Sequence, residues 1–255
     1  LLWVSLDSRR RSRLMLINCD VSGLEVVVAG DLSGDEVLRN EVRNKVNFHS
    51  DNQARFGLPD RVTAKRFIFK LLYGASAYGY SVDADFINVG FSQKDWQQVI
   101  DEFYTKYIGI KQWHETLLEI VKKQGYLEIP SGRCYSYEAR WNGRDWKWPL
   151  TTIKNYPIQG FGADLVMLAR IEFYKQLKAS GLEGLFIQTI HDSLVVDCPS
   201  KNVTAIAAMM QEAITKVPEM CYTNWKYKFS LPLSSEVQVG PNKKDLIDLK
   251  DFKCE

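Results

Sequence analysis

Two aspartates that follow apolar strand patterns constrain the fold of this chain more than any other feature. Asp20 ends residues 13–20, which have the pattern of a buried strand, and Asp192 lies between two later strand patterns, residues 184–190 and 194–197. A single aspartate after a strand is often only a turn former or a helix cap. Together, however, two such acids can be presented at one sheet edge, where their hard oxygens suit Mg²⁺ and phosphoryl transfer. We therefore expect an antiparallel sheet that carries both acids.

The composition is that of an ordinary globular chain of 255 residues, with 45% hydrophobic and 25% charged residues. The net charge is only +2, so an acidic partner must be met by locally clustered charge. No apolar stretch reaches the roughly 18 residues needed to cross a bilayer, which predicts no membrane partner. The cysteines are odd in number and contain no C-x-x-C pair, which favours reduced thiols and a cytoplasmic location. They are Cys19, Cys134, Cys198, Cys221 and Cys254.

Helical and strand patterns follow one another in a mixed order, which predicts an α+β fold. Ser22 and Glu25 have capping-box spacing at the start of a short helix, and Asp60 is the expected N-cap of a helix that stops near Gly74. The expected helices cover residues 22–31, 61–75, 92–124 with a weak point near Gly109, 162–179 and 202–216. Residues 125–150 predict a short hairpin and loop, and residues 233–239 predict a closing strand.

The helix expected at residues 61–75 presents one distinctive face. Arg61, Lys65, Phe69 and Tyr73 recur at steps of four, so their side chains share one side of the helix. The cationic half could hold a triphosphate, and the aromatic half could stack on a base. The alternative is a solvated basic start on an amphipathic helix whose aromatic residues belong to the core.

These motifs together resemble motifs A, B and C of family A DNA polymerases, the class of bacterial DNA polymerase I. The matching segments, in chain order, are Asp20-x-Ser22-x-x-Glu25, Arg61-x3-Lys65-x3-Phe69-x3-Tyr73-Gly74 and His191-Asp192. Further matches are Phe48-His49, Gly125-Tyr126 and Asn155-Tyr-Pro157-Ile-Gln159-Gly160. The resemblance implies an α+β polymerase palm at residues 1–39 and 126–255. It also implies an inserted helical fingers subdomain at residues 40–125.

The resemblance also implies a reaction and its catalytic residues. Asp20 and Asp192, helped by the backbone carbonyl of Val21, would hold two Mg²⁺ ions. The 3′-hydroxyl of a primer would then attack the α-phosphorus of a deoxynucleoside triphosphate and release pyrophosphate. Lys65 would protonate this leaving group. The implied cofactor is therefore Mg²⁺, and the implied partners are primer-template DNA and dNTPs.

Binding roles are implied for further residues of the same motifs. The predicted nucleotide-binding residues are Glu25, His49, Arg61, Lys65, Phe69 and Tyr73. Among these, Glu25 corresponds to a steric gate that excludes the ribose 2′-hydroxyl. The predicted DNA-binding residues are Asn155, Gln159 and His191, with His191 beside the primer terminus.

Three departures from the family pattern leave alternatives open. Ser193 replaces the usual glutamate of motif C, as in single-subunit RNA polymerases, although Glu25 and Phe69 match the DNA enzymes. Gly23 stands where bacterial members often have glutamine, which makes this position similar to that of phage-encoded relatives. Thr151 replaces a family arginine. Ser193 leaves a single-subunit type of RNA polymerase as an alternative to DNA synthesis. A further alternative, from a different class, is a catalytically idle nucleic-acid-binding subunit of a replicase.

Family members carry a thumb and usually a 3′→5′ exonuclease before motif A, and few residues precede Asp20 here. We expect a second polypeptide to supply these regions, as in a split polymerase, with a fragment as the alternative. The basic residues Arg9, Arg10, Arg11 and Arg13 predict either phosphate contacts or a solvated tail. Residues 135–148 interleave aromatic and basic side chains, which favours loop packing or contact with the missing partner over a single-strand platform.

Overall fold

The computed structural model describes residues 14–253 and divides them into two compact units. One unit consists of the described residues up to Leu24 together with those from Gly162 onward, and the other is Glu25–Phe161. These boundaries fall at other positions than those expected for palm and fingers, at 39/40 and 125/126. The assignment of residue ranges to palm and fingers stays a prediction.

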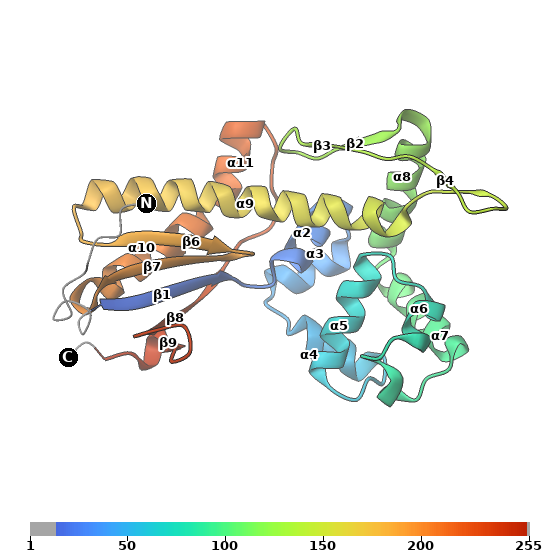
Figure 1. The fold of residues 1–255 in the computed structure, drawn as a ribbon, viewed down its shortest axis with the longest axis horizontal. Helices are drawn as coiled ribbons and strands as arrows, with labels where there is room; N and C mark the ends of the chain where they lie inside the picture. The colour runs from blue at the N-terminus through green and yellow to red at the C-terminus, as the bar shows by residue number, and fades with distance from the viewer. Residues whose placement is uncertain (1–13, 254–255) are drawn as a thin grey trace. The chain divides into compact units, whose positions relative to one another are not determined.

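The first unit is built on a five-stranded antiparallel sheet in the order β6-β7-β1-β8-β9 (Figure 1). Its strands are β1 (Leu14–Val21), β6 (Leu185–Ile190), β7 (Ser193–Pro199), β8 (Ser235–Gly240) and β9 (Ile247–Asp248). The first strand of the chain therefore lies in the middle of the sheet, between strands that come near its end. This arrangement confirms the expected α+β fold with an antiparallel sheet.

The two faces of β1 differ in burial towards the end of the strand, because side chains alternate along a strand. Ile17 and Cys19 are fully buried and lie opposite buried apolar residues of both neighbours. These neighbours are Leu194 and Val196 on β7 and Val237 and Val239 on β8. Helix α10 (Val203–Thr215) contacts β1, β7 and β8, and η2 (Ser200–Asn202), α11 (Val217–Trp225) and η3 (Leu249–Asp251) complete the unit with part of α9. The other face of β1 carries Asn18 and Asp20.

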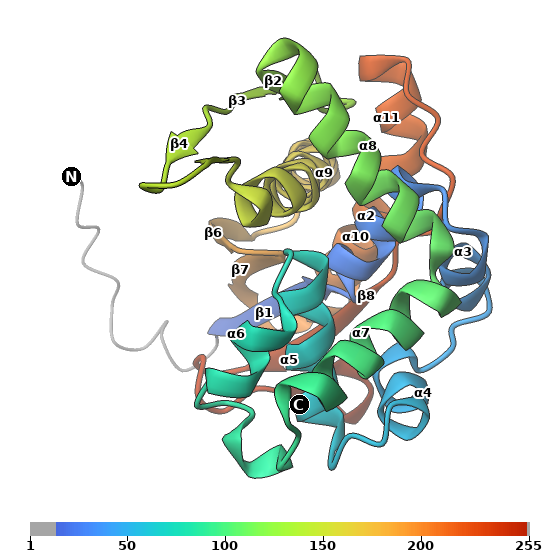
Figure 2. The same cartoon turned by 90° about the vertical axis from the view of Figure 1, so that its right-hand side faces the viewer.

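The second unit is mainly helical, and α5, α6 and α7 lie side by side in it (Figure 2). Its helices are α2 (Leu24–Ser33), α3 (Glu36–Arg43), α4 (Phe48–Arg55), α5 (Arg61–Leu72), α6 (Ala77–Val82), η1 (Ile87–Val89), α7 (Gln93–Lys106) and α8 (Ile108–Gln124). An aromatic cluster joins three of these helices. The ring of Trp96 lies 5.0 Å from that of Tyr80 and 5.7 Å from that of Phe67, and the Tyr80 hydroxyl donates to the Phe67 carbonyl. Such pairs add to the energy of apolar burial.

Two predicted helix starts, those of α5 and α7, are confirmed by their caps. The Asp60 side chain accepts a hydrogen bond of 2.8 Å from the Thr63 amide at the start of α5. Ser92 and Asp95 form a capping box at the start of α7. Each cap satisfies amides that would otherwise lack a partner at a helix N-terminus.

The helical stretch at residues 92–124 breaks at Tyr107, two residues before the expected weak point at Gly109. Tyr107 is fully buried, and its hydroxyl donates to Glu41 at 2.8 Å. The Gly109 amide donates to Asp35 at 2.8 Å. Contacts with α3 and the residue that caps it therefore fix the break, and sequence pattern alone could not show them.

The expected helix at residues 162–179 was wrong at its start. Helix α9 covers Leu150–Ser180 and continues through Pro157. Proline removes one helical hydrogen bond and usually ends or kinks a helix. Here Ile153, Ile158 and Phe161 are buried on either side of it, so packing outweighs the local preference. Helices α3, α4, α6 and α11 were not predicted.

The irregular segment after α8 forms two short hairpins, where the sequence predicted one hairpin and a loop. Strands β2 (Tyr126–Glu128) and β3 (Cys134–Ser136) form one, and β4 (Arg140–Trp141) and β5 (Trp146–Lys147) form the other. Tyr137 is buried in a small apolar cluster, which confirms the expected loop packing there. Trp141 and Trp146 are exposed and contact each other edge to face.

Some sequence predictions concern residues outside 14–253, namely the arginines at positions 9, 10, 11 and 13 and Cys254. Among the described cysteines none forms a disulfide. Within the same residues, no helix combines the length and the apolar character that a bilayer crossing requires.

Candidate active site

The two aspartates lie on adjacent strands of the first unit. In the antiparallel register Asp20 of β1 is opposite Ser193 of β7, the residue that follows Asp192. The Val21 amide donates to the Asp192 carbonyl at 3.1 Å. His191 adopts a left-handed backbone conformation with φ 52°, which closes the tight turn between β6 and β7. Strand pairing therefore brings the two acids to one end of the sheet, as expected.

The donor set at this end suits a hard cation. Asp20 and Asp192 are both partly exposed, so a ligand can reach their oxygens. Magnesium is commonly bound by one or two carboxylates and completes its shell with water and substrate phosphates. Among the described residues no group of three or more His, Cys, Asp or Glu side chains could hold a metal by itself. The residues present fit Mg²⁺ in the two-carboxylate form.

Glu236 is a residue of this region that the sequence analysis missed. It lies directly opposite Asp20 on β8, and directly opposed residues of an antiparallel pair point to the same face. Glu236 is exposed. Its signal in the sequence is the alternation of Glu236, Val237, Gln238 and Val239, but only the register between strands shows which residue it opposes.

Ser193, which replaces the usual glutamate, is engaged within its own hairpin. Its side chain is buried and donates a hydrogen bond of 3.0 Å to the Ile190 carbonyl. The hydroxyl thus stabilises the turn that carries Asp192.

In the second unit, His49 of α4 lies against Phe69, on the face of α5 where the predicted residues recur at steps of four. The rings of His49 and Phe69 lie 5.5 Å apart, edge to face, and the Lys65 ammonium lies 5.5 Å from the centre of the Phe69 ring. Arg61 and Lys65 are exposed. Burial lowers the pKa of His49 to about 4, and the charges of Lys65 and Arg61 act in the same direction. His49 is therefore a neutral imidazole beside two cations.

Three residues meet near the end of α5. The Gln159 amide donates to the Tyr73 hydroxyl. Burial raises the pKa of Tyr73 to about 12, the charge of Glu25 raises it further, and the hydrogen bond from Gln159 lowers it. Tyr73 therefore stays a neutral phenol that is held in place from one side by an amide.

Asn155 and His191 are the other two predicted DNA-binding residues. The Asn155 Oδ1 atom is buried and has no hydrogen-bond partner among the described residues, so it is available to a ligand or a water. His191 is exposed in the turn before Asp192.

The predicted residues thus form two sets, one in each unit. The first unit brings together Asp20, Val21, His191 and Asp192, and the second contains Glu25, His49, Arg61, Lys65, Phe69, Tyr73, Asn155 and Gln159. The two aspartates lie on the sheet side of this division, and the cations and aromatic rings lie on the helices together with Glu25, Asn155 and Gln159.

Known proteins are similar to this chain in sequence and in fold. The model of the family described as DNA polymerase family A matches residues 8–245, so the chain belongs to that family. Among curated relatives it is 27% identical over 235 residues to a DNA polymerase I of Chloroflexus aurantiacus, covering 89% of this chain and 24% of the relative. It is 29% identical over 236 residues to a thermostable DNA polymerase I of Thermus filiformis, covering 89% and 26%.

A solved structure has the same fold. It is the POL domain of Pol1 from M. smegmatis, in complex with DNA primer-template and dNTP, at a TM-score of 0.76 and 20% identity. The match covers 89% of this chain and 40% of that one. The chain spans about a quarter of the length of the curated relatives that it matches.

Proposed function

We propose that this chain carries the catalytic part of a template-directed DNA polymerase. In this reaction a primer 3′-hydroxyl attacks the α-phosphorus of a dNTP, the bond to the β-phosphate breaks, and pyrophosphate leaves. The observation that carries the proposal is the pairing of β1 with β7, which places Asp20 beside the Asp192 turn in a member of family A.

The sheet residues would hold the metal. Asp20 and Asp192 would bind two Mg²⁺ ions with the help of the Val21 carbonyl. When bound, the metal supplies an activated hydroxyl and charge stabilisation at the phosphoryl group. His191 would lie beside the primer terminus.

The residues of the second unit would bind the nucleotide and the DNA. Arg61 and Lys65 would contact the β- and γ-phosphates through charge-assisted hydrogen bonds, and Lys65 would donate a proton to the leaving pyrophosphate. His49, being neutral, would add a hydrogen bond without a charge. Phe69 and Tyr73 would line the base and sugar pocket.

Two further contacts are part of the proposal. Glu25 would exclude the ribose 2′-hydroxyl, and its electrostatic effect on Tyr73 supports a place beside that ring. Asn155 and Gln159 would contact the primer-template, for which the unpartnered Oδ1 of Asn155 is suited.

Primer extension with Asp192→Ala tests the central claim. We expect extension to fall by several orders of magnitude, because the remaining carboxylate cannot hold the ions. Asp197→Ala is the matched control, since Asp197 lies outside the site on β7, the strand that follows Asp192. Equal activity of the Asp192 variant and the control would reject the proposal. If the wild-type chain never extends a primer, even when thumb regions are supplied, the remaining interpretation is a catalytically idle nucleic-acid-binding subunit.

Sugar choice separates DNA synthesis from the RNA polymerase alternative. With Glu25→Ala we expect discrimination against ribonucleotides to fall at least about tenfold, because the group that crowds the 2′-hydroxyl is gone. Glu36→Ala, an exposed glutamate on α3, is the control. An unchanged preference would contradict the gate.

A second polypeptide with thumb and 3′→5′ exonuclease stays a prediction, as do the phage-like character and the cytoplasmic location. Extension assays with and without a chain that supplies thumb helices test the first of these. A neighbouring reading frame that encodes such helices would support a split enzyme.

A further inference from the structure

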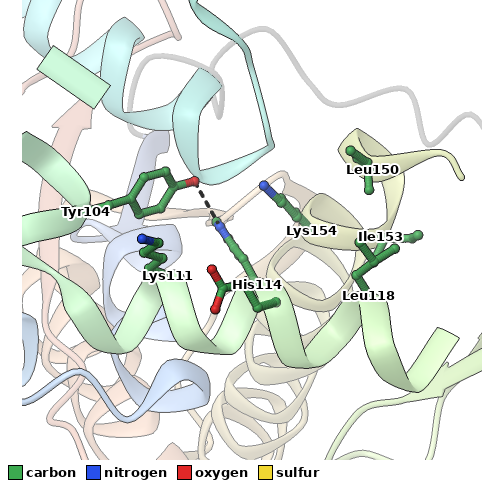
Figure 3. Close-up of a pocket in the computed structure, with 8 residues that line it drawn as sticks. Tyr104, Lys111, His114, Leu118, Leu150, Ile153 and Lys154 are labelled. Atoms are coloured by element: carbon green, nitrogen blue, oxygen red, sulfur yellow. Dashed lines mark hydrogen bonds between the residues drawn. The ribbon is translucent and has the colours of Figure 1, made fainter. Parts of the chain in front are cut away.

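A cavity of about 200 Å³ lies in the second unit, between residues of α7, α8 and the start of α9 (Figure 3). It is lined by Tyr104 of α7, by Lys111, His114, Glu115 and Leu118 of α8, and by Leu150, Ile153 and Lys154 of α9. None of these residues belongs to the motifs that support the proposed function. An apolar cavity of about 150 Å³ already accommodates benzene, so this one is large enough for a nucleobase-sized ring.

The histidine of the cavity is incompletely satisfied. His114 is 4% exposed, and its Nδ1 lies 3.2 Å from the Tyr104 hydroxyl (Figure 3). Its Nε2 atom is buried and makes no hydrogen bond of normal geometry with a described residue. Burial lowers the pKa of His114 to about 3, the Lys154 charge acts in the same direction, and the Leu72 carbonyl opposes them. A buried neutral imidazole whose Nε2 atom lacks a hydrogen bond of normal geometry favours a further polar partner there, because an incompletely paired atom costs free energy.

The lysines of the cavity are unequally exposed. Lys111 is exposed, whereas Lys154 is partly buried, and burial lowers the pKa of its ammonium. The charge of Glu115 opposes this effect. Two ammonium groups and one carboxylate give the lining a net charge of about +1 at neutral pH, which matches the single negative charge of a phosphodiester.

The remaining lining is apolar. Ile153 is buried and joins a cluster with Leu117 and Val121, and Leu118 packs on the same cluster. These side chains form an apolar wall on which the face of a planar ring can pack. Clefts that combine apolar walls with a few polar groups are typical binding sites.

We propose that this cavity binds one unpaired nucleotide of a DNA strand, with the base against Leu118 and Ile153 and the phosphate between Lys111 and Lys154. The assignment of the ligand to DNA rests on the proposed function. The same chemistry is offered by a free deoxynucleoside monophosphate, so the test separates the two sources.

The ring resonances of His114 provide a direct readout. The chain has three histidines, so each resonance can be assigned from a His→Gln variant. The probes are dAMP, deoxyadenosine without phosphate, and a short single-stranded oligodeoxynucleotide. We expect the oligonucleotide to shift the His114 resonance and deoxyadenosine to act much more weakly. A shift with dAMP as well would mean that a mononucleotide suffices.

Charge removal tests the phosphate contact. Lys154→Gln and the exposed Lys111→Gln should each weaken oligonucleotide binding, measured by fluorescence anisotropy, by about tenfold, as expected for one charge-assisted hydrogen bond. Lys122→Gln, an exposed lysine of α8 outside the cavity, is the matched control. The Lys111 variant keeps the test valid if Lys154→Gln does not fold.

The inference is overturned if the His114 resonance stays unchanged with both phosphate probes, or if Lys122→Gln weakens binding as much as the cavity variants. Its failure is distinct from that of the proposed function. If primers are extended but the His114 resonance does not shift, the cavity site alone is rejected. If the His114 resonance shifts but primers are not extended, the cavity site is supported and the polymerase activity is rejected.

Discussion

The surroundings of His49 and the cavity around His114 contain similar groups that are assembled in different ways. Each has a buried histidine with a lowered pKa, an aromatic neighbour and cationic side chains nearby. The neighbours of His49 recur at steps of four on one helix, α5. The neighbours of His114 come from α7, α8 and α9. Periodicity in a sequence reveals the first kind of site and conceals the second.

The two histidines also differ in their hydrogen bonds. The Nδ1 atom of His49 is buried without a partner among the described residues, whereas that of His114 lies beside the Tyr104 hydroxyl. The exposed cations beside His49 suit a mobile, highly charged triphosphate. The half-buried Lys154 suits a ligand with one negative charge.

The largest expected effect is on stability at low pH. The pKa is lowered to about 4 for His49 and to about 3 for His114. Below pH 6.5, which is about the ordinary histidine pKa, the unfolded chain therefore binds more protons than the folded one. Stability is therefore lost as the pH falls from about 6.5, by up to about 1.4 kcal/mol per pH unit for each histidine. Urea denaturation at a series of pH values measures this slope.

The groups that face these rings are Arg61 and Lys65 for His49, and Tyr104, Lys111, Glu115 and Lys154 for His114. His49→Gln and His114→Gln should each remove part of the slope, and the exposed His191→Gln is the control. If His49→Gln or His114→Gln leaves the dependence of the unfolding free energy on pH unchanged, the two histidines are not buried alike and the comparison between them is wrong.

The next effect separates the two lysine environments by activity. Lys65→Gln should lower kcat/KM for dNTP addition by about a hundredfold, because it removes a donor to the charge that develops on the pyrophosphate. Lys154→Gln should change kcat little and act on the apparent affinity for template. Steady-state primer extension with both variants measures the split. A kcat loss in Lys154→Gln as large as that in Lys65→Gln would mean that the cavity takes part in catalysis.

A smaller effect concerns Gly74, which follows α5 and lies next to the Lys154 side chain of the cavity. Gly74 follows α5 with φ 87°, and a Cβ there would lie 3.0 Å from Cδ of Lys154. Gly74→Ala should cost about 1–2 kcal/mol for the left-handed backbone alone. Gly57→Ala is a matched control, since Gly57 has φ 62° and nothing within 4 Å of its added Cβ.

The difference between these two glycine variants in urea denaturation isolates the contact with Lys154. A larger cost for Gly74→Ala, with weaker oligonucleotide binding, would show that α5 and the cavity are coupled through that side chain. Equal costs would show that the lysine moves aside freely.

The smallest expected effect is at Tyr104. Tyr104→Phe removes the hydroxyl beside the His114 Nδ1 atom and should lower the free energy of unfolding by about 1 kcal/mol. It should also shift the His114 ring resonances and leave those of His49 in place. Movement of the His49 resonances would indicate that the two histidine environments are not independent.

The predictable part of the site follows from local patterns. The strand ending at Asp20, the tight turn at Asp192 and the face of α5 each follow from residues close together in the chain. The start of α9 was wrong because Pro157 is a strong local signal, and burial of Ile153 and Phe161 outweighs it. Glu236 and His114 were missed because their neighbours belong to other elements.

The sequence by itself determined the family, the α+β order and the side of each element that carries chemistry, since these depend on the periods of a helix and a strand. Only the tertiary structure decided that Glu236 opposes Asp20, that Ser193 bonds to its own turn, and that Tyr104, His114 and Lys154 share a cavity. Register and packing between elements set these contacts, and they depend on the summed burial of many side chains and not on any short stretch of chain.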